Sequence, residues 1–192
     1  LGTAGFTAAY GVKKIVDQGI GTGDGSVLVT GATGGVGSLA VAILSRIGFS
    51  IIAVTGKKEQ EPFLKRLGAA EVVSREWVTD ISGAPMLSAR WSAAIDTVGG
   101  EMLDAVLRQT GHNGVVACCG NILGGTLKTS IYPLILRGIA LMGIDSGNCL
   151  MNDRVEIWQK LAGDWRPENP EAISHKCALN DLPREIEKIL QG

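Results

Sequence analysis

The chain has 192 residues, which is enough for one sizeable domain with a buried core. Its 18 lysines and arginines nearly balance its 19 acidic residues, so no basic excess favours nucleic acid or an anionic membrane as a partner. No apolar run reaches the roughly 18 residues of a membrane span, and no stretch has the pattern of a secretory signal. We therefore expect a cytoplasmic protein that contacts neither nucleic acid nor membrane.

Short apolar runs that alternate with helical patterns predict the fold class. The runs predict strands at 26–30, 50–55, 71–74, 92–98, 114–119 and 139–144. Most are almost continuously apolar, as expected for strands that are covered on both faces. Helices are predicted at 4–18, 34–48, 57–69, 100–111, 152–165 and 180–191, with Gly68 and Gly111 as C-terminal caps.

This alternation predicts an α/β protein with a doubly wound parallel sheet of about six strands, the Rossmann fold, and helices on both faces. We expect residues 1–165 to form the dinucleotide-binding domain, with its leading helix. The Pro-rich stretch "RPENPEA" then opens a separate C-terminal segment, 166–192.

The stretch "VLVTGATGGVGSLA" (27–40) places four glycines between a buried strand and an amphipathic helix. A pyrophosphate group needs close access to the unpaired N–H groups at a helix N-terminus, and side chains there would block it. We interpret the loop as a dinucleotide site. The alternative is a tight turn with a structural role alone.

The end of the second predicted strand bears on which dinucleotide binds. NAD-binding proteins usually place a carboxylate about 20 residues after the glycines, where it holds the ribose diol. Here the sequence is "VTGKKE" (54–59), with two lysines before the first carboxylate. A bound 2′-phosphate would explain the lysines and indicates NADP(H), although they could also be solvated surface residues. Arg75, after the third strand, could reach the same end of the cofactor or be a surface residue.

Two dehydrogenase superfamilies compete for this loop. "TGATGGVG" fits the loop of the short-chain dehydrogenases, and Tyr10 and Lys14 form a Y-x-x-x-K pair. In those enzymes the catalytic tyrosine follows the fourth strand, whereas Tyr10 precedes the first. We interpret Tyr10–Lys14 as a chance match.

The order of motifs resembles the medium-chain dehydrogenase/reductase superfamily over nearly the whole chain. "GTAGFTA", "TGATGGVGS", "AIDTVGG", "PLILRGI" and "GIDS" are similar to the zinc-independent, quinone-oxidoreductase-like branch that contains the NADPH-dependent acryloyl-CoA reductases. The resemblance implies hydride transfer from NADPH to an activated alkene, either an enoyl thioester or a quinone. The alternative is a stand-alone module that binds or senses the dinucleotide without catalysis.

The resemblance also implies which residues bind the cofactor. Gly34, Gly35, Val36, Gly37 and Ser38 would hold the pyrophosphate; Thr55, Gly56, Lys57 and Arg75 the adenosine phosphate; and Gly120, Asn121, Asp145 and Ser146 the nicotinamide end. Lys57 stands where the family often has arginine, and lysine lacks the bidentate guanidinium. Asp96 is expected to cap the "TVGG" turn and to have no catalytic role.

The resemblance carries further expectations about metal and assembly. Zinc alcohol dehydrogenases of the superfamily have a cysteine ligand where this chain has Ala4, and a methyl group cannot bind zinc, so no metal site is expected. The family's catalytic tyrosine lies in a preceding GroES-like domain, so we expect a fragment without catalytic residues that is inactive alone. The apolar sixth strand would be a sheet edge and would join two copies as a homodimer.

The four cysteines are expected to be free core thiols.

Overall fold

The structure is a computed structural model that describes residues 1–174 and 176–191. Six parallel strands form one sheet in the order β3-β2-β1-β4-β5-β6. The strands are β1 (Val27–Val29), β2 (Ile51–Val54), β3 (Glu71–Val73), β4 (Trp91–Asp96), β5 (Thr110–Cys118) and β6 (Ala140–Gly143). The predicted doubly wound sheet is confirmed, and β6 is an edge strand as expected.

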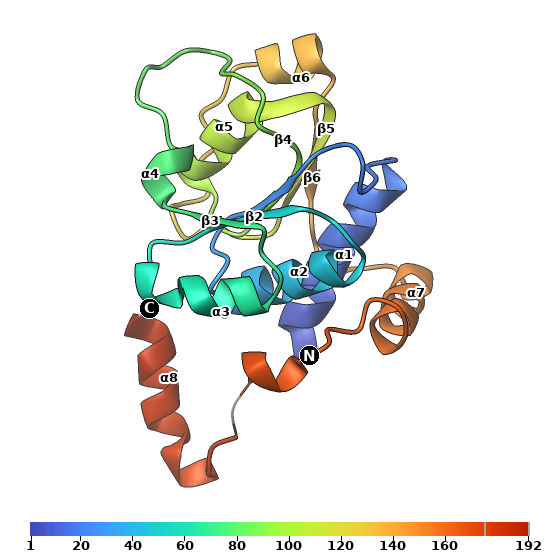
Figure 1. Cartoon of the computed structure of the whole chain (residues 1–192), viewed down its shortest axis with the longest axis vertical. Coiled ribbons are helices and arrows are strands. Elements are labelled where there is room, and N and C mark those ends of the chain that lie inside the picture. The colour runs from blue at the N-terminus through green and yellow to red at the C-terminus, as the bar shows by residue number, and fades with distance from the viewer. Residues whose placement is uncertain (175, 192) are drawn as a thin grey trace.

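Helices cover both faces of the sheet (Figure 1). The α-helices are α1 (Gly2–Asp17), α2 (Gly35–Arg46), α3 (Glu61–Arg66), α4 (Arg75–Val78), α5 (Gly100–Gln109), α6 (Tyr132–Arg137), α7 (Met151–Ala162) and α8 (Leu182–Gln191). Three short 3-10 helices complete the described chain: η1 (Lys58–Gln60), η2 (Pro170–Ile173) and η3 (Leu179–Asp181).

The two faces of the sheet carry separate cores because side chains alternate along each strand. Val27 and Val29 of β1 point into a core shared with α1, α2, α3 and α7. Leu28 points the other way, into a core shared with α4 and α5. All three side chains are fully buried. A central strand that is covered on both faces cannot show a polar–apolar alternation, which explains the continuous apolar runs in the sequence.

Of the two glycines predicted to cap helix C-termini, Gly68 does so and Gly111 does not. Gly68 follows α3 with φ +100°, and the N–H groups of Gly68 and Ala69 bond to carbonyls of the last turn, at Lys65 and Leu64. Gly111 does not cap α5. That helix ends at Gln109, and Thr110 passes directly into β5 in extended conformation.

The C-terminal segment extends away from the sheet (Figure 1). Its last helix, α8, packs chiefly against η3 among the described residues. The apolar side chains of Leu182, Ile186 and Ile189 are all exposed on it. Residues 175 and 192 of the predicted segment 166–192 lie outside the described residues. None of the described helices combines the length and apolarity needed to cross a bilayer.

Candidate dinucleotide site

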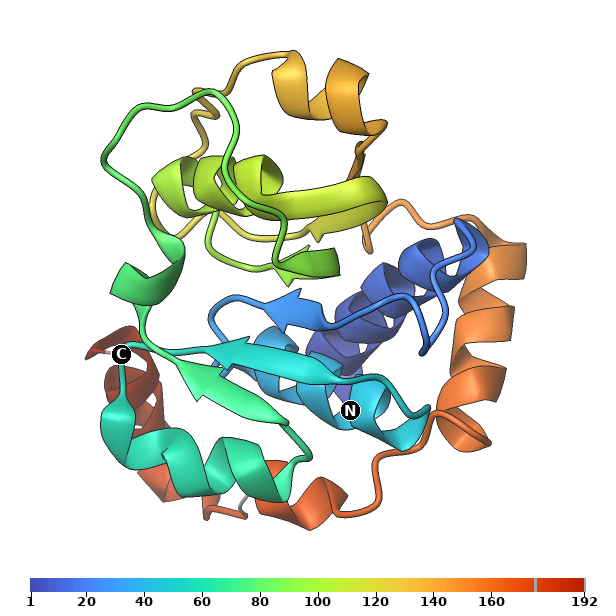
Figure 2. The same cartoon turned by 45° about the horizontal axis from the view of Figure 1, so that its top comes forward.

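The candidate site lies where the carboxyl ends of β1, β2 and β4 meet (Figure 2). β1 pairs with β2 on one side and with β4 on the other, so the strand order reverses there. In doubly wound sheets ligands bind outside the carboxyl ends of the strands, at such a reversal point. The glycine loop directly follows β1 and therefore lies at this point.

The glycine loop turns sharply before α2 begins. Gly31 has φ +58°, which disfavours other residues, and its carbonyl accepts a hydrogen bond from Gly34 N at 2.9 Å. A Cβ at Gly37 would lie only 2.3 Å from the Gly31 oxygen, so α2 packs directly on the loop backbone. Gly31 and Gly37 are therefore required by the fold itself. Access for a ligand is not the reason for these two glycines.

The N-terminus of α2 is open to an anion. Gly34 is its N-cap, no side chain caps it, and its first turn holds no acidic residue. A Cβ at Gly35 would meet only the Ala4 methyl group, at 3.7 Å. Unpaired N–H groups and the helix dipole attract negative charge at such an end. The sequence-predicted cradle thus fits a pyrophosphate, except that Ser38 is buried and its hydroxyl lies near the Gly35 carbonyl, at 3.5 Å.

Thr55 connects the glycine loop with the end of β2. Its buried hydroxyl lies 3.5 Å from the hydroxyl of Thr33 in the loop and accepts a hydrogen bond from Lys57 N at 3.0 Å. Sequence reasoning included Thr55 and Lys57 in the site but missed Thr33. The signal was present, since Thr33 is the one hydroxyl residue among the loop positions 31–37.

Positive charge gathers beyond the end of β2, as the lysine pair indicated. Lys57 precedes η1, and Lys58 begins it. Arg75 of α4 reaches across from the end of β3, so that a Cβ at Gly56 would lie 2.9 Å from its Nε. The structure therefore brings the predicted Gly56, Lys57 and Arg75 together. This donor set suits a phosphate monoester.

Glu76 is a carboxylate beside this positive cluster that sequence reasoning missed. Its own backbone N–H and the Ser74 hydroxyl lower its pKa, with smaller contributions from the charges of Arg75 and Lys58. Glu76 is therefore ionised at neutral pH. It offsets part of the positive charge that a bound phosphate would meet.

Asp96 is buried at the end of β4 and organises the turn that follows. Its carboxylate accepts hydrogen bonds from Thr30 Oγ1 at 2.7 Å and from Gly99 N at 2.8 Å. Burial raises its pKa, while the Thr30 and Gly99 donors act in the opposite direction. The predicted structural role of Asp96 as the cap of the "TVGG" turn is confirmed.

The residues expected at the nicotinamide end follow β5 and β6. Gly120 packs so tightly on Thr97, just after β4, that a Cβ would lie 1.9 Å from the Thr97 carbonyl oxygen, whereas Asn121 is exposed. Ile144 N bonds to the Cys118 carbonyl, which brings Asp145 close to the end of β5. The Asp145 carboxylate accepts bonds from Gly147 N and Asn148 N, and the Ser146 carbonyl accepts one from Arg154. The Asp145 carboxylate therefore stabilises the turn of its own loop through these two backbone hydrogen bonds.

The Y-x-x-x-K pair does not form a short-chain dehydrogenase site. Lys14 Nζ lies over the Tyr10 ring, 5.0 Å from its centroid, and both residues belong to α1. The lysine therefore contacts the face of the ring. α1 precedes β1 and packs chiefly against α2, so the pair does not follow the fourth strand as in those enzymes, and the interpretation as a chance match agrees with the structure.

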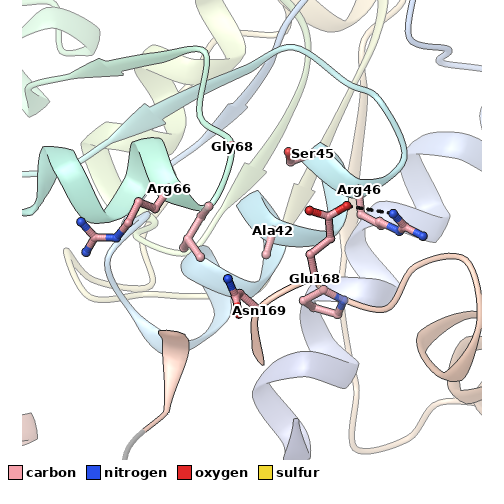
Figure 3. Close-up of a pocket in the computed structure, with 9 residues that line it drawn as sticks. Ala42, Ser45, Arg46, Arg66, Gly68, Glu168 and Asn169 are labelled. Atoms are coloured by element: carbon pink, nitrogen blue, oxygen red, sulfur yellow. Dashed lines mark hydrogen bonds and ion pairs between the residues drawn. The ribbon is translucent and has the colours of Figure 1, made fainter. Parts of the chain in front are cut away.

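A pocket of about 270 Å³ opens at the opposite end of α2 from the glycine loop. It lies between the ends of α2 and α3 and residues 167–169 (Figure 3). Arg46 forms an ion pair there with Glu168 at 2.9 Å. Because α2 has 12 residues and rises about 1.5 Å per residue, this pocket is separate from the dinucleotide site.

The four cysteines are free, as predicted, but none is fully buried: Cys118 and Cys149 pack against the two cores from their margins. Cys177 is exposed, and the other three are half-buried. The Cys119 thiol lies 3.6 Å from the Asp96 carbonyl, and burial raises its pKa to about 12. No group of three or more histidine, cysteine or acidic residues able to hold a metal occurs within 1–174 and 176–191.

Thiol chemistry should separate these cysteines. With a disulfide reagent at mildly alkaline pH, we expect Cys177 to react fast, because it is exposed, and Cys119 to stay unmodified, because little thiolate forms at a pKa of about 12. Release of the reporter thiol measures both rates. The Cys177→Ser variant should lose the fast phase, and a fast phase that persists would contradict the assignment.

Comparison with known proteins shows the family of the chain. The family model described as "Zinc-binding dehydrogenase" matches residues 35–163, from the start of α2 to the end of α7. The chain belongs to this family, within the medium-chain dehydrogenase/reductase superfamily and its quinone-oxidoreductase-like branch.

Two of the relatives match the chain over its whole length. The acrylyl-CoA reductase AcuI of Ruegeria pomeroyi is 41% identical over 192 residues, which are 100% of this chain and 58% of that protein. YhfP of Bacillus subtilis, named provisionally as a quinone oxidoreductase, is 42% identical over the same share of each chain. The chain thus spans 58% of the length of either relative.

Solved structures of relatives share the fold and contain dinucleotides. YhfP of Bacillus subtilis, solved with NAD bound, superposes with a TM-score of 0.95 at 41% identity, covering 99% of this chain and 58% of that one. YhdH of Escherichia coli, solved with NADPH bound, gives a TM-score of 0.94 at 39% identity with the same coverage. Both cofactors therefore occur among close structural relatives.

Proposed function

We propose that this chain is the NADP(H)-binding part of an oxidoreductase that reduces an activated alkene, either an enoyl thioester such as acryloyl-CoA or a quinone. The observation that carries the proposal is the pairing of the uncapped N-terminus of α2 with the cluster of Lys57, Lys58 and Arg75. The first suits a pyrophosphate, and the second suits a 2′-phosphate. The NADPH-containing relative supports this assignment.

The chain's own residues would bind and orient the cofactor. Gly34 and Gly35 leave its pyrophosphate access to the N–H groups of α2. Thr55 would hold the end of β2 against the glycine loop through Thr33 and would hold the backbone of Lys57 through its N–H, which fixes the adenosine end relative to the pyrophosphate. When bound, NADPH supplies a hydride for the β-carbon of the alkene. Gly120 keeps the neighbouring loop close to β4 and so forms one wall of the nicotinamide end.

The proposal assigns no catalytic side chain to this chain. Placing a substrate against the cofactor requires an enclosing pocket, and the relatives have further chain that this sequence does not cover. The exposed apolar face of α8, with Leu182, Ile186 and Ile189, would pack against that further part of a whole protein. We also propose that the whole protein is cytoplasmic and that its substrate is a small molecule.

The experiment that tests this function has two arms. Calorimetric titration with NADPH should show binding by the chain alone. An NADPH-oxidation assay with acryloyl-CoA and with a quinone should show no turnover by these residues alone. Robust turnover would contradict the view that the substrate pocket needs further chain. Binding without turnover even in a longer chain that includes the remaining part would favour a sensing module.

A homodimer through β6 is a further part of the proposal. β6 is an edge strand with Leu141 exposed, and α6, which precedes it in the chain, exposes Ile135 and Leu136. Unpaired strand edges with apolar neighbours favour association. We expect sedimentation at tens of micromolar to show a dimer, and Leu141→Lys to shift it to monomer. Ile81→Lys, a change at an exposed loop residue, is the control. A monomer in the unmodified chain would contradict the proposal.

A further inference from the structure

Arg154, near the start of α7, bonds to the backbone of the loop that follows β6. Its Nη2 donates to the Ser146 carbonyl oxygen at 2.8 Å and to the Gly147 carbonyl oxygen at 3.3 Å. Ser146 is one of the residues that the sequence places at the nicotinamide end of the candidate site. A side chain that no motif of the sequence singled out therefore holds part of this site.

The peptide unit between Ser146 and Gly147 is held at both of its polar atoms. Arg154 donates to its carbonyl oxygen, and the Asp145 carboxylate accepts its N–H, that of Gly147, at 3.1 Å. Asp145 in turn accepts bonds from the backbone N–H and the side-chain amide of Asn148, at 3.1 and 2.7 Å. One cation and one anion thus fix the plane of a single peptide unit in the loop.

Ser146 keeps its own donors free while its carbonyl is held. Within the described residues, neither its N–H nor its hydroxyl forms a hydrogen bond. Its side chain is half-buried just beyond β6. A ligand group at this edge of the sheet would meet donors on a loop whose conformation is already set. Such a loop loses little further entropy when a ligand binds.

Arg154 is itself held against the core. The side chain is half-buried, and its Cζ lies 4.7 Å from the centroid of the Phe6 ring in α1. Phe6 is buried, and its ring centroid lies 5.6 Å from that of Trp158 in α7. A guanidinium that lies over an aromatic ring and donates to two carbonyls has a defined position. The loop after β6 is therefore tied to α1 and α7 through this one side chain.

We propose that Arg154 is a positioning residue for the nicotinamide end of the cofactor: it fixes the peptide unit of Ser146 and Gly147 so that Ser146 presents its free donors beyond β6. This inference rests on the proposed function. Arg154 acts through Ser146 and needs no contact with the dinucleotide. Its loss should therefore affect the nicotinamide half of NADPH, and the adenosine half, at the end of β2, should be insensitive.

The test compares two ligands by calorimetry: NADPH, and adenosine 2′,5′-bisphosphate, which has the adenosine end but no nicotinamide. Arg154→Met keeps an apolar stem over Phe6 and removes both bonds to the loop. It should weaken NADPH binding about fivefold and leave binding of the bisphosphate within about twofold, because only the nicotinamide end is loosened. At saturating protein, the fluorescence anisotropy of the reduced nicotinamide should also fall, because the ring is held less firmly.

Two further variants serve as rescue and control. Arg154→Lys keeps the charge and one donor group and should restore part of the affinity for NADPH. Arg46→Met is the matched control, because Arg46 pairs with Glu168 at the C-terminal end of α2 and contacts no residue of this loop. It should change the affinity of neither ligand. The thermal midpoints of all three variants should stay close to that of the unmodified chain.

Several outcomes would overturn the inference. Equal weakening of NADPH and the bisphosphate by Arg154→Met would show that the arginine supports the domain as a whole, and so would a variant that fails to fold. Unchanged NADPH binding, or an unmodified chain that binds both ligands equally well, would show that the loop does not serve the nicotinamide end. An unmodified chain that binds neither ligand would instead contradict the proposed function, so the two failures are distinguishable.

Discussion

Replacing Gly37 with alanine is expected to lower the free energy of unfolding by about 2 kcal/mol, because an added methyl group overpacks a rigid contact. Its Cβ would lie 2.3 Å from the Gly31 oxygen and 2.8 Å from Ala32 Cα, and neither backbone atom can move without opening the loop. Chemical denaturation followed by circular dichroism measures the loss. NADPH binding should fall with it, because the same loop forms the pyrophosphate cradle.

Gly35→Ala is the matched control in the same turn of α2. Its Cβ would meet only the Ala4 methyl group, at an ordinary contact distance of 3.7 Å. Alanine is also the better helix former, so stability should stay equal or rise slightly. If Gly35→Ala destabilised the chain as much as Gly37→Ala, close packing of α2 on the loop could not be the reason for Gly37.

Replacing Asp96 with alanine is expected to cost about 3 kcal/mol, because it leaves buried donors without acceptors. Thr30 Oγ1 and Gly99 N both donate to this fully buried carboxylate. The turn after β4 would lose its cap and β1 would lose a side-chain bond to β4. Thermal unfolding of the purified variant measures the effect.

Asp145→Ala provides the comparison for Asp96. Asp145 also accepts two backbone N–H bonds, from Gly147 and Asn148, but it is exposed. Water can replace the carboxylate there, so the thermal midpoint should shift much less. Similar shifts for the two variants would argue that burial is not what makes Asp96 important.

The fold was largely predictable from sequence because its strands are buried on both faces. Continuous apolar runs mark such strands, and their alternation with helices defines the parallel topology. Short elements were not predicted. α4 has four residues and α6 has six, which is too few for an apolar period to emerge. Gly111 was misplaced as a cap because a glycine can also lie within a strand, as Gly111 does in β5, which its letter alone does not show.

The residues of the candidate site could be predicted from sequence, but the contacts among them could not. The glycine loop, Lys57 and Arg75 could be selected from their positions after successive strands. That Arg75 lies against Gly56 depends on how α4 is placed at the end of β3, which no local pattern encodes. The reasons for Gly31 and Gly37 likewise needed the backbone geometry: a left-handed turn and a close contact between α2 and the loop. Thr33 could have been selected as the one hydroxyl residue of the loop, whereas Glu76 became apparent only through its neighbours.

Calorimetric titration of this chain with NADPH and NADH tests the account most directly. The uncapped α2 N-terminus and the cluster of Lys57, Lys58 and Arg75 lead us to expect binding of both dinucleotides, with NADPH bound about tenfold or more tightly because of its 2′-phosphate. Tighter binding of NADH, or binding of neither dinucleotide below millimolar concentrations, would contradict it.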